Sequence, residues 1–145
     1  MNTIYRRVLL LATVAIGAYV GVWAAFFPES FYVSFPGFGL HWIDVDGAYN
    51  EHLIRDVGSL YLALGVGSLA AALSRSALPG RVLGLVWAVF GVLHLVYHLG
   101  HLHGSVLDVV GNVVSLGASA LLGVLLMLPV RGERASAEPP RGQGA

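Results

Sequence analysis

Four long apolar runs constrain this sequence more than any other feature. They cover residues 8–27, 53–73, 82–101 and 106–130 of the 145-residue chain. A helix needs about 20 mostly apolar residues to cross the hydrocarbon core of a bilayer, and each run has that length. Because the connections at 74–81 and 102–105 are short, neighbouring helices should run antiparallel. The sequence therefore predicts an all-α fold, a membrane-spanning antiparallel four-helix bundle over residues 1–130.

The composition favours a lipid environment over a water-soluble domain. Apolar residues make up 57% of the chain and charged residues only 11%, whereas a soluble domain carries roughly 25% charged residues. A soluble chain of this size could not bury so much apolar surface in one core. The first run could alternatively be a signal peptide cleaved before Ala25, but it is longer than a typical signal-peptide core, which favours a retained helix. The lipid bilayer is therefore the expected partner.

The arginines predict how the bundle is oriented. Seven of the eight lie at one end of the predicted helices, and Arg55 alone lies near the other end. The positive-inside rule places the arginine-rich end in the cytoplasm. We therefore expect a multi-pass plasma-membrane protein with both termini in the cytoplasm and the 28–50 loop outside. Residues 131–145 are rich in Pro, Gly and charge and are expected to form a disordered cytoplasmic tail.

Cysteine content and net charge exclude several classes of function. The chain has no cysteine, so it can have neither disulfides nor thiol redox chemistry nor cysteine-ligated iron–sulfur clusters. Its formal net charge is zero, and nothing indicates nucleic acid as a partner. A membrane-protein partner or a homo-oligomer is compatible with the sequence.

Polar side chains gather in the outer half of three predicted helices. In the third run, His94, His98 and His101 are spaced i, i+4, i+7, which places them on one helix face. An ionisable residue inside a membrane is costly and marks a functional site by default. We therefore predict one buried His/carboxylate pocket in the outer half. The other two helices contribute residues at the same depth: Glu51, His52, Arg55, Asp56 and Ser59 from the second run, and Asp108, Asn112 and Ser115 from the fourth.

These residue types fit a metal or haem site. Two imidazoles at i and i+4 can bind one metal ion from a single helix face. Carboxylates from neighbouring helices would complete a set suited to Zn, Fe or Mn. A single histidine can also ligate haem, and either centre would permit a redox role. The candidate metal ligands are His94, His98, His101, His52, Asp56, Glu51 and Asp108, with Arg55, Ser59, Asn112 and Ser115 as polar lining.

Two metal-free interpretations fit the same residues. A histidine beside an acid titrates near physiological pH, so the pocket could be a small-molecule or proton pathway. Alternatively, the polar groups could be structural, in an accessory subunit of a membrane complex. Glu51 and Arg55 then form an ordinary i,i+4 ion pair, and the segment from Ser105 to Asp108 is a helix-start signal. No substrate or enzymatic reaction is indicated.

The 28–50 loop carries aromatic residues between two prolines, namely Phe31, Tyr32, Phe35, Phe38 and Trp42. Such a composition favours the membrane interface. The loop is expected to be either an interfacial anchor or a lid across the outer mouth of the bundle. The segment "DVDG" at 44–47 resembles the start of a calcium loop but lacks its remaining ligands, so we assign it no ion.

Small residues at four-residue spacing predict close packing of the helices. The fourth run has Gly111, Ser115, Ser119 and Gly123, while "GAYVG" at 17–21 and "GRVLG" at 80–84 match the GxxxG pattern. Small residues let helix backbones approach closely inside a membrane. The pattern is most extended in the fourth helix, where we expect the closest packing.

The four-helix plan resembles the DoxX-like group of small bacterial membrane proteins. The segment "YNEHLIRDVGSLYLALG", residues 49–65, also looks like stretches of uncharacterised actinobacterial membrane proteins. The resemblance covers the helical chain up to about residue 128. It implies a quinone-linked or accessory redox role, but it assigns no functional residue, because the histidines of the third run match no motif of that group.

Overall fold

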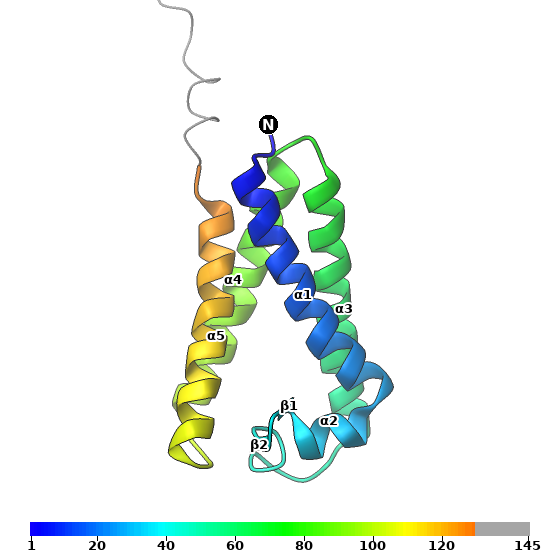
Figure 1. Ribbon diagram of the computed structural model, residues 1–145, viewed down its shortest axis with the longest axis vertical. Helices are drawn as coiled ribbons and strands as arrows, with labels where there is room; N and C mark the ends of the chain where they lie inside the picture. Colours follow the sequence, from blue (N-terminus) through cyan, green and yellow to red (C-terminus); the bar gives the residue numbers. More distant parts are fainter. Residues whose placement is uncertain (130–145) are drawn as a thin grey trace, which may run out of the picture.

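The computed structural model describes residues 1–129 and is an all-α bundle (Figure 1). Its long helices are α1 (Ile4–Phe26), α3 (Glu51–Leu73), α4 (Leu78–Leu99) and α5 (Val106–Met127). Each of the four is long and apolar enough to cross a membrane. The predicted four-helix bundle is therefore confirmed. The predicted tail at 131–145 lies outside the described residues.

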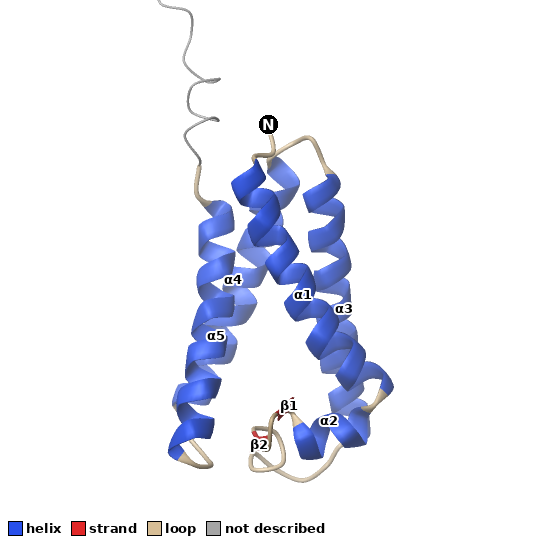
Figure 2. Cartoon of the chain, in the orientation of Figure 1, coloured by secondary structure: helices blue, strands red, loops and turns tan. Residues whose placement is uncertain are grey.

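The segment between α1 and α3 folds into compact short elements (Figure 2). Helix α2 (Pro28–Ser34) is followed by an antiparallel hairpin of β1 (Pro36–Gly37) and β2 (Leu40–His41). The hairpin turns at Gly37 and Gly39, whose φ angles of 88° and 76° suit glycine because it has no Cβ. The loop expected from the sequence is thus a folded cap with its own local structure.

The long helices form two pairs, α1 with α3 and α4 with α5, that separate toward one end of the molecule (Figure 1). We call the end with residues 1–3, the 74–77 turn and the last turn of α5 the terminal end. The opposite end, with α2, the hairpin and the 100–105 turn, is the loop end. The two pairs contact each other through Leu10 and Leu126 near the terminal end and through Tyr61 and Trp87 at mid-height.

Glycines bring the backbones of each pair into direct contact. A Cβ added at Gly58 of α3 would fall on the backbone of Ala25 in α1, and one added at Gly123 of α5 would fall on that of Ala88 in α4. Gly17 meets α3 in the same way. The close packing predicted for "GAYVG" is therefore confirmed. In the small-residue series predicted for the fourth helix, it is confirmed at Gly123 and at the buried Ser119, whereas Ser115 is exposed.

Arg6 joins α1 to α5 at the terminal end. Arg6 is 1% exposed, and its Nε and Nη2 donate to the carbonyl oxygens of Leu126 (3.3 Å) and Leu128 (2.9 Å). These carbonyls lie in the last turn of α5 and just beyond it, where helix carbonyls lack partners within the helix and where positive charge is favourable. The sequence analysis treated Arg6 only as a charge that orients the chain, whereas in the structure it also joins α1 to α5.

Candidate functional site

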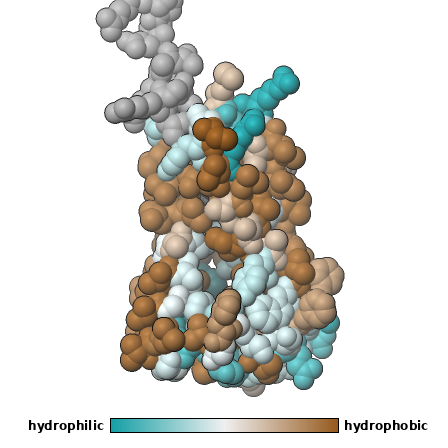
Figure 3. All heavy atoms as spheres, in the orientation of Figure 1, coloured by the Kyte–Doolittle hydropathy of each residue, from teal (hydrophilic) through white to brown (hydrophobic). Residues whose placement is uncertain are grey.

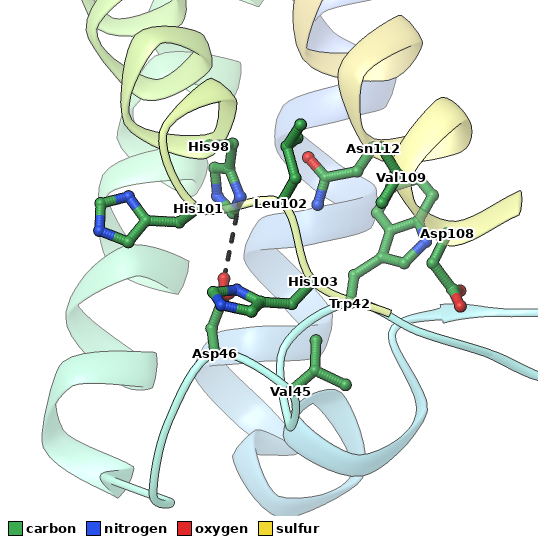
Figure 4. Close-up of a pocket in the computed structure, with 10 residues that line it drawn as sticks. All are labelled: Trp42, Val45, Asp46, His98, His101, Leu102, His103, Asp108, Val109 and Asn112. Atoms are coloured by element: carbon green, nitrogen blue, oxygen red, sulfur yellow. Dashed lines mark hydrogen bonds and ion pairs between the residues drawn. The ribbon is translucent and has the colours of Figure 1, made fainter. Parts of the chain in front are cut away.

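The loop end is more polar and more open than the terminal end. Figure 3 shows a hollow between the two helix pairs, bordered by pale and teal residues in the half of the molecule near the loop. The segment that follows β2 crosses this end and contacts the last turn of α4 and the first turns of α5 (Figure 4). The functional side chains of the loop end therefore come from α4, α5 and the loop.

The histidines at the end of α4 form a polar chain with one loop carboxylate. The Nε2 atoms of His94 and His98 are 3.1 Å apart. His98 Nδ1 lies 3.8 Å from Oδ2 of Asp46, and His103 Nδ1 lies 3.2 Å from Oδ1 of the same carboxylate. The side chain of His98 is 12% exposed and that of Asp46 is 23% exposed. Figure 4 shows Asp46 reaching from the loop toward both imidazoles.

A small cavity lies beside this chain. Its volume of about 10 Å³ is close to the space that one water molecule needs. In Figure 4, the amide of Asn112 projects from α5 toward the side of the cavity that holds His98. The lining residues are Trp42, Val45, Asp46, His98, His101, Leu102, His103, Asp108, Val109 and Asn112.

Four buried polar atoms at the loop end have no hydrogen-bond partner within residues 1–129. They are Nδ1 of His94, Nε1 of Trp42, Oδ1 of Asp44 and Oδ1 of Asn112. A buried donor or acceptor without a partner costs about 1–3 kcal/mol, so each such atom calls for a binding partner such as water. Trp42 and Asn112 both line the cavity, so the cavity offers one donor and one acceptor to a molecule of about the size of water.

Asp108 holds the loop and the start of α5 together. Its carboxylate accepts hydrogen bonds from the Ser105 amide at 3.0 Å and hydroxyl at 2.6 Å, and from the His41 amide at 3.3 Å. The first of these and the bond from the Asp108 amide to the Ser105 hydroxyl oxygen at 3.2 Å form a capping box in which Ser105 is the N-cap of α5. The helix-start interpretation of Ser105 and Asp108 is therefore confirmed, and the bond from His41 adds a link to the hairpin that the sequence did not indicate.

Trp42 docks the loop onto α5 next to this carboxylate. A Cβ added at Gly111 would lie 2.8 Å from Cζ2 of Trp42. Gly111 thus leaves the space that the indole ring occupies, and any larger residue would push the ring away. Gly111 was predicted to pack against another helix, but in the structure it packs against the loop. This contact favours the lid interpretation of the loop.

The polar residues of α3 lie apart from the histidine chain. His52 and Asp56 pair with each other at 3.3 Å, with side chains 88% and 62% exposed. Glu51 pairs with Arg55 at 2.8 Å, and Arg55 also donates to the carbonyl oxygen of Ala25. Ser59 donates to the carbonyl oxygen of Arg55 at 2.8 Å. The structure does not bring these five side chains into a pocket, because they follow the outward face and edge of α3.

Of the remaining predicted residues, Asn112 and His101 line the cavity and Ser115 does not. Asn112 lines the cavity, while Ser115 is exposed and donates to the carbonyl oxygen of Asn112 at 2.9 Å. His101 stacks on Tyr97 with ring centroids 4.2 Å apart, and Figure 4 shows its ring turned away from His98. The physical reason is that α4 ends at Leu99 rather than at residue 101, so the helical spacing does not extend to His101.

The predicted seven-residue metal set is not assembled. Among the described residues, no group of three or more His, Asp or Glu side chains is arranged to hold a metal ion. Within this set, the two imidazoles that the structure brings together are those of His94 and His98. The carboxylate beside that pair is Asp46, which the sequence analysis missed because a loop has no periodicity from which a facing direction can be read. The only signal was the acidic "DVDG" segment itself.

Comparisons with protein-family models, curated proteins and solved structures find no match to this chain. The resemblance to the DoxX-like group, with its implied redox role, therefore stays a prediction from the sequence.

Proposed function

We propose that this chain is a multi-pass membrane protein that binds protons at its loop end through a metal-free chain of histidines and one aspartate. The observation that carries the proposal is the continuous series His103, Asp46, His98 and His94, with successive atoms 3.2, 3.8 and 3.1 Å apart. The series begins at an exposed histidine outside the helix and ends inside α4 at His94, which is partly buried and whose Nδ1 atom is fully buried.

Imidazole and carboxylate groups in this order can receive and pass on a proton. Each imidazole has two ring nitrogens, so it accepts a proton on one side and donates one on the other. His94 and His98 face each other through Nε2 at 3.1 Å, and one proton between them gives a hydrogen bond. With both rings neutral, His98 carries its proton on Nδ1, toward Asp46, and His94 donates from Nε2 to His98 Nε2. One additional proton then binds at the remaining ring nitrogen, Nδ1 of His94, and the charge of Asp46 compensates the imidazolium that forms.

The tight packing of the terminal half of the bundle favours a proton-binding site at the loop end over a proton channel through the bundle. Leu10, Trp87 and Leu126 are 0% exposed, and the indole N–H of Trp87 donates to the Ser68 hydroxyl at 3.0 Å. No polar chain among residues 1–129 continues from His94 through this packed region. Protons that reach His94 therefore enter and leave from the loop end.

The predicted orientation decides from which side of the membrane protons reach the site. If the arginine-rich terminal end faces the cytoplasm, the loop end faces outward and the site responds to the pH outside the plasma membrane. A periplasmic or extracellular position of the loop is tested with reporter fusions after Ala145 and within residues 43–49. A cytoplasmic loop would reverse the direction from which protons enter.

Proton binding is tested on the purified protein in lipid nanodiscs. Ring-nitrogen NMR of ¹⁵N-histidine-labelled protein is recorded between pH 4 and 9, alongside elemental analysis for bound metals. We expect coupled titration of His94 and His98, lost from the remaining imidazole in His94→Ala or His98→Ala. His52→Ala is the matched control, because His52 is an exposed histidine that pairs with Asp56.

Two results would reject the proposal. The first is a stoichiometric metal ion that is lost in His94→Ala, since this would establish the metal-binding hypothesis instead. The second is titration of His98 that is the same in the presence and absence of His94, since the two rings would then not share a proton.

A further inference from the structure

The outward face of α3 differs from the outward faces of α4 and α5. In α4 and α5, exposed positions carry large aliphatic side chains that suit contact with lipid chains, among them Val89, Leu93, Val96, Val110 and Val114. In α3, the positions opposite the buried face carry ionisable, polar and small residues and one valine, while exposed leucines such as Leu53 and Leu73 lie to either side of them. The residues at these positions are His52, Asp56, Ser59, Ala63, Val66 and Ala70, and all six are exposed. We call these six residues the α3 seam.

The seam has the spacing of a helix-packing interface. Its members follow one another at intervals of 4, 3, 4, 3 and 4 residues, which is the 3.5-residue repeat of a left-handed pair of helices. At about 100° per residue, they lie within a narrow strip along the helix. The buried residues of α3, including Ile54, Gly58 and Tyr61, lie on the opposite side. The seam is therefore a second packing face, separate from the one that α1 occupies.

The ionisable residues of the seam make exposure to lipid unfavourable. The side chain of Asp56 is 62% exposed and that of His52 is 88% exposed, and Asp56 lies more than one helical turn inside α3. Ionisable groups within membrane segments almost always face a protein interior or a water-filled cavity. Within the described chain, the seam has no such cover apart from the pairing of His52 with Asp56, and a second protein surface would supply it.

The charges of the seam indicate which protein surface covers it. The seam carries one acid and one base one turn apart, so it is complementary to itself. In a parallel two-fold pair of helices, each seam side chain packs against the same residue of the second copy and against the residues of that copy's adjacent layers. Asp56 of one copy would then lie beside both Asp56 and His52 of the second copy, so that two carboxylates and two imidazoles form one cluster whose charges balance when both imidazoles are protonated. Two copies with the same orientation in the membrane place both seams at the same depth.

We propose that the α3 seam is the interface of a homodimer with its two-fold axis along the membrane normal. The position of α3 at one margin of the bundle, with α5 at the opposite margin (Figure 1), leaves the seam accessible to a second copy. Ser59, Ala63 and Ala70 would allow the two backbones to approach closely. The proposal is independent of proton binding, because no seam residue belongs to the histidine chain.

The absence of cysteine from the sequence allows a direct test by disulfide cross-linking in membranes. Ala63→Cys places one thiol on the seam, and Ala118→Cys is the matched control. Both positions are exposed alanines, and each lies 12 residues after the first residue of its helix at the loop end. We expect a disulfide-linked dimer to form at least about tenfold faster with Ala63→Cys, and the purified wild-type protein to have the mass of a dimer.

A second pair of variants tests the role of the charges. Asp56→Asn in the Ala63→Cys background should slow cross-linking about fivefold. Glu51→Gln should leave it unchanged, because Glu51 is an equally paired acid of α3 that lies off the seam. Equal cross-linking rates at Ala63 and Ala118 would overturn the proposal. A monomeric wild-type protein whose Ala63→Cys variant cross-links to a different protein would overturn it as well, in favour of another partner.

Discussion

The two ends of the bundle satisfy their polar groups in different ways. At the terminal end, the buried Arg6 side chain donates to backbone carbonyls of α5, and Asn2 donates to the carbonyl oxygens of Ala71 and Ser74 at 3.0 Å each. At the loop end, imidazoles and carboxylates meet one another, as His98 and His103 meet Asp46. Buried polar atoms without a hydrogen-bond partner within residues 1–129 occur at both ends, among them Oδ1 of Asn2 and Nε1 of Trp42. The ends therefore differ in what pairs: side chains with backbone carbonyls at the terminal end, and titratable side chains with one another at the loop end.

The comparison also extends to how the backbone is packed. Along α5, Gly123 toward the terminal end contacts backbone atoms of Ala88, whereas Gly111 near the loop end contacts the ring of Trp42. A backbone atom cannot move without moving its helix, but a side chain on a loop can. Equivalent changes at the two ends should therefore have unequal effects, and this provides a series of tests along one helix.

The largest effect is expected for Gly123→Ala. Its Cβ would overlap the backbone of Ala88 and force α4 and α5 apart, which should cost about 3 kcal/mol or more. Gly117→Ala in the same helix is the matched control, because nothing lies within 4 Å of a Cβ at that position, and alanine should gain up to ~1 kcal/mol. Thermal unfolding in detergent measures both. Equal destabilisation would show that α5 does not pack as described.

Arg6→Met should be the next most harmful change. Methionine retains the length of the side chain but leaves the carbonyl oxygens of Leu126 and Leu128 without this donor, at a cost of about 1.5–3 kcal/mol. Arg7→Met controls for the loss of one positive charge, since Arg7 is only partly buried. The measurement is the free energy of unfolding in mixed micelles. A larger loss for Arg7→Met would contradict the assignment of the capping role to Arg6.

Gly111→Ala should loosen the loop while leaving the bundle folded. The added methyl group would lie 2.8 Å from Cζ2 of Trp42 and displace the ring, because a side chain yields more easily than a backbone. Hydrogen exchange of peptides from residues 35–49 should become at least about fivefold faster, while α4 and the terminal half of α5 are unaffected. Unchanged hydrogen exchange in the loop would indicate that Trp42 does not hold the loop against α5.

Asp46→Asn should have the smallest effect on stability and a clear effect on proton binding. Its contacts with His98 and His103 are partly exposed ion pairs, and such pairs contribute about 0–1 kcal/mol. Without the negative charge, protonation of the His94–His98 pair becomes less favourable, so its titration should move to lower pH. Asp44→Asn, which removes a pair with His41 at 3.3 Å, is the control. A shift of the same size in both variants would exclude a specific role for Asp46.

The sequence predicted the bundle well because membrane spans depend on length and hydrophobicity, which are local properties. It also located the pair of His94 and His98, since helical spacing alone places i and i+4 on one face. It did not predict that Asp56 lies outside the pocket. A polar stripe has the same spacing whether it faces the interior or a second protein, and only the arrangement of α1 against α3 decides between them.

The role of Asp46 could not be predicted from the sequence, for a different physical reason. Its position depends on the cap formed by α2 and the hairpin, and on Trp42 entering the space left by Gly111. These are contacts between residues that are far apart in the chain. His103 lies beyond the end of α4 at Leu99, so helical spacing cannot predict its direction, and the segment after the helix brings it to Asp46.

The position of Arg6 has a consequence for how the protein is made. Its donors meet carbonyls 120 and 122 residues later in the sequence, so these bonds form only after the last span has left the ribosome and entered the bilayer. Until then, the terminal end of α1 is held through Asn2, which reaches Ala71 and Ser74 at the end of α3. The link between α1 and α5 through Arg6 is therefore a late step of biosynthesis, and a chain truncated before α5 would lack these two acceptors of the guanidinium group.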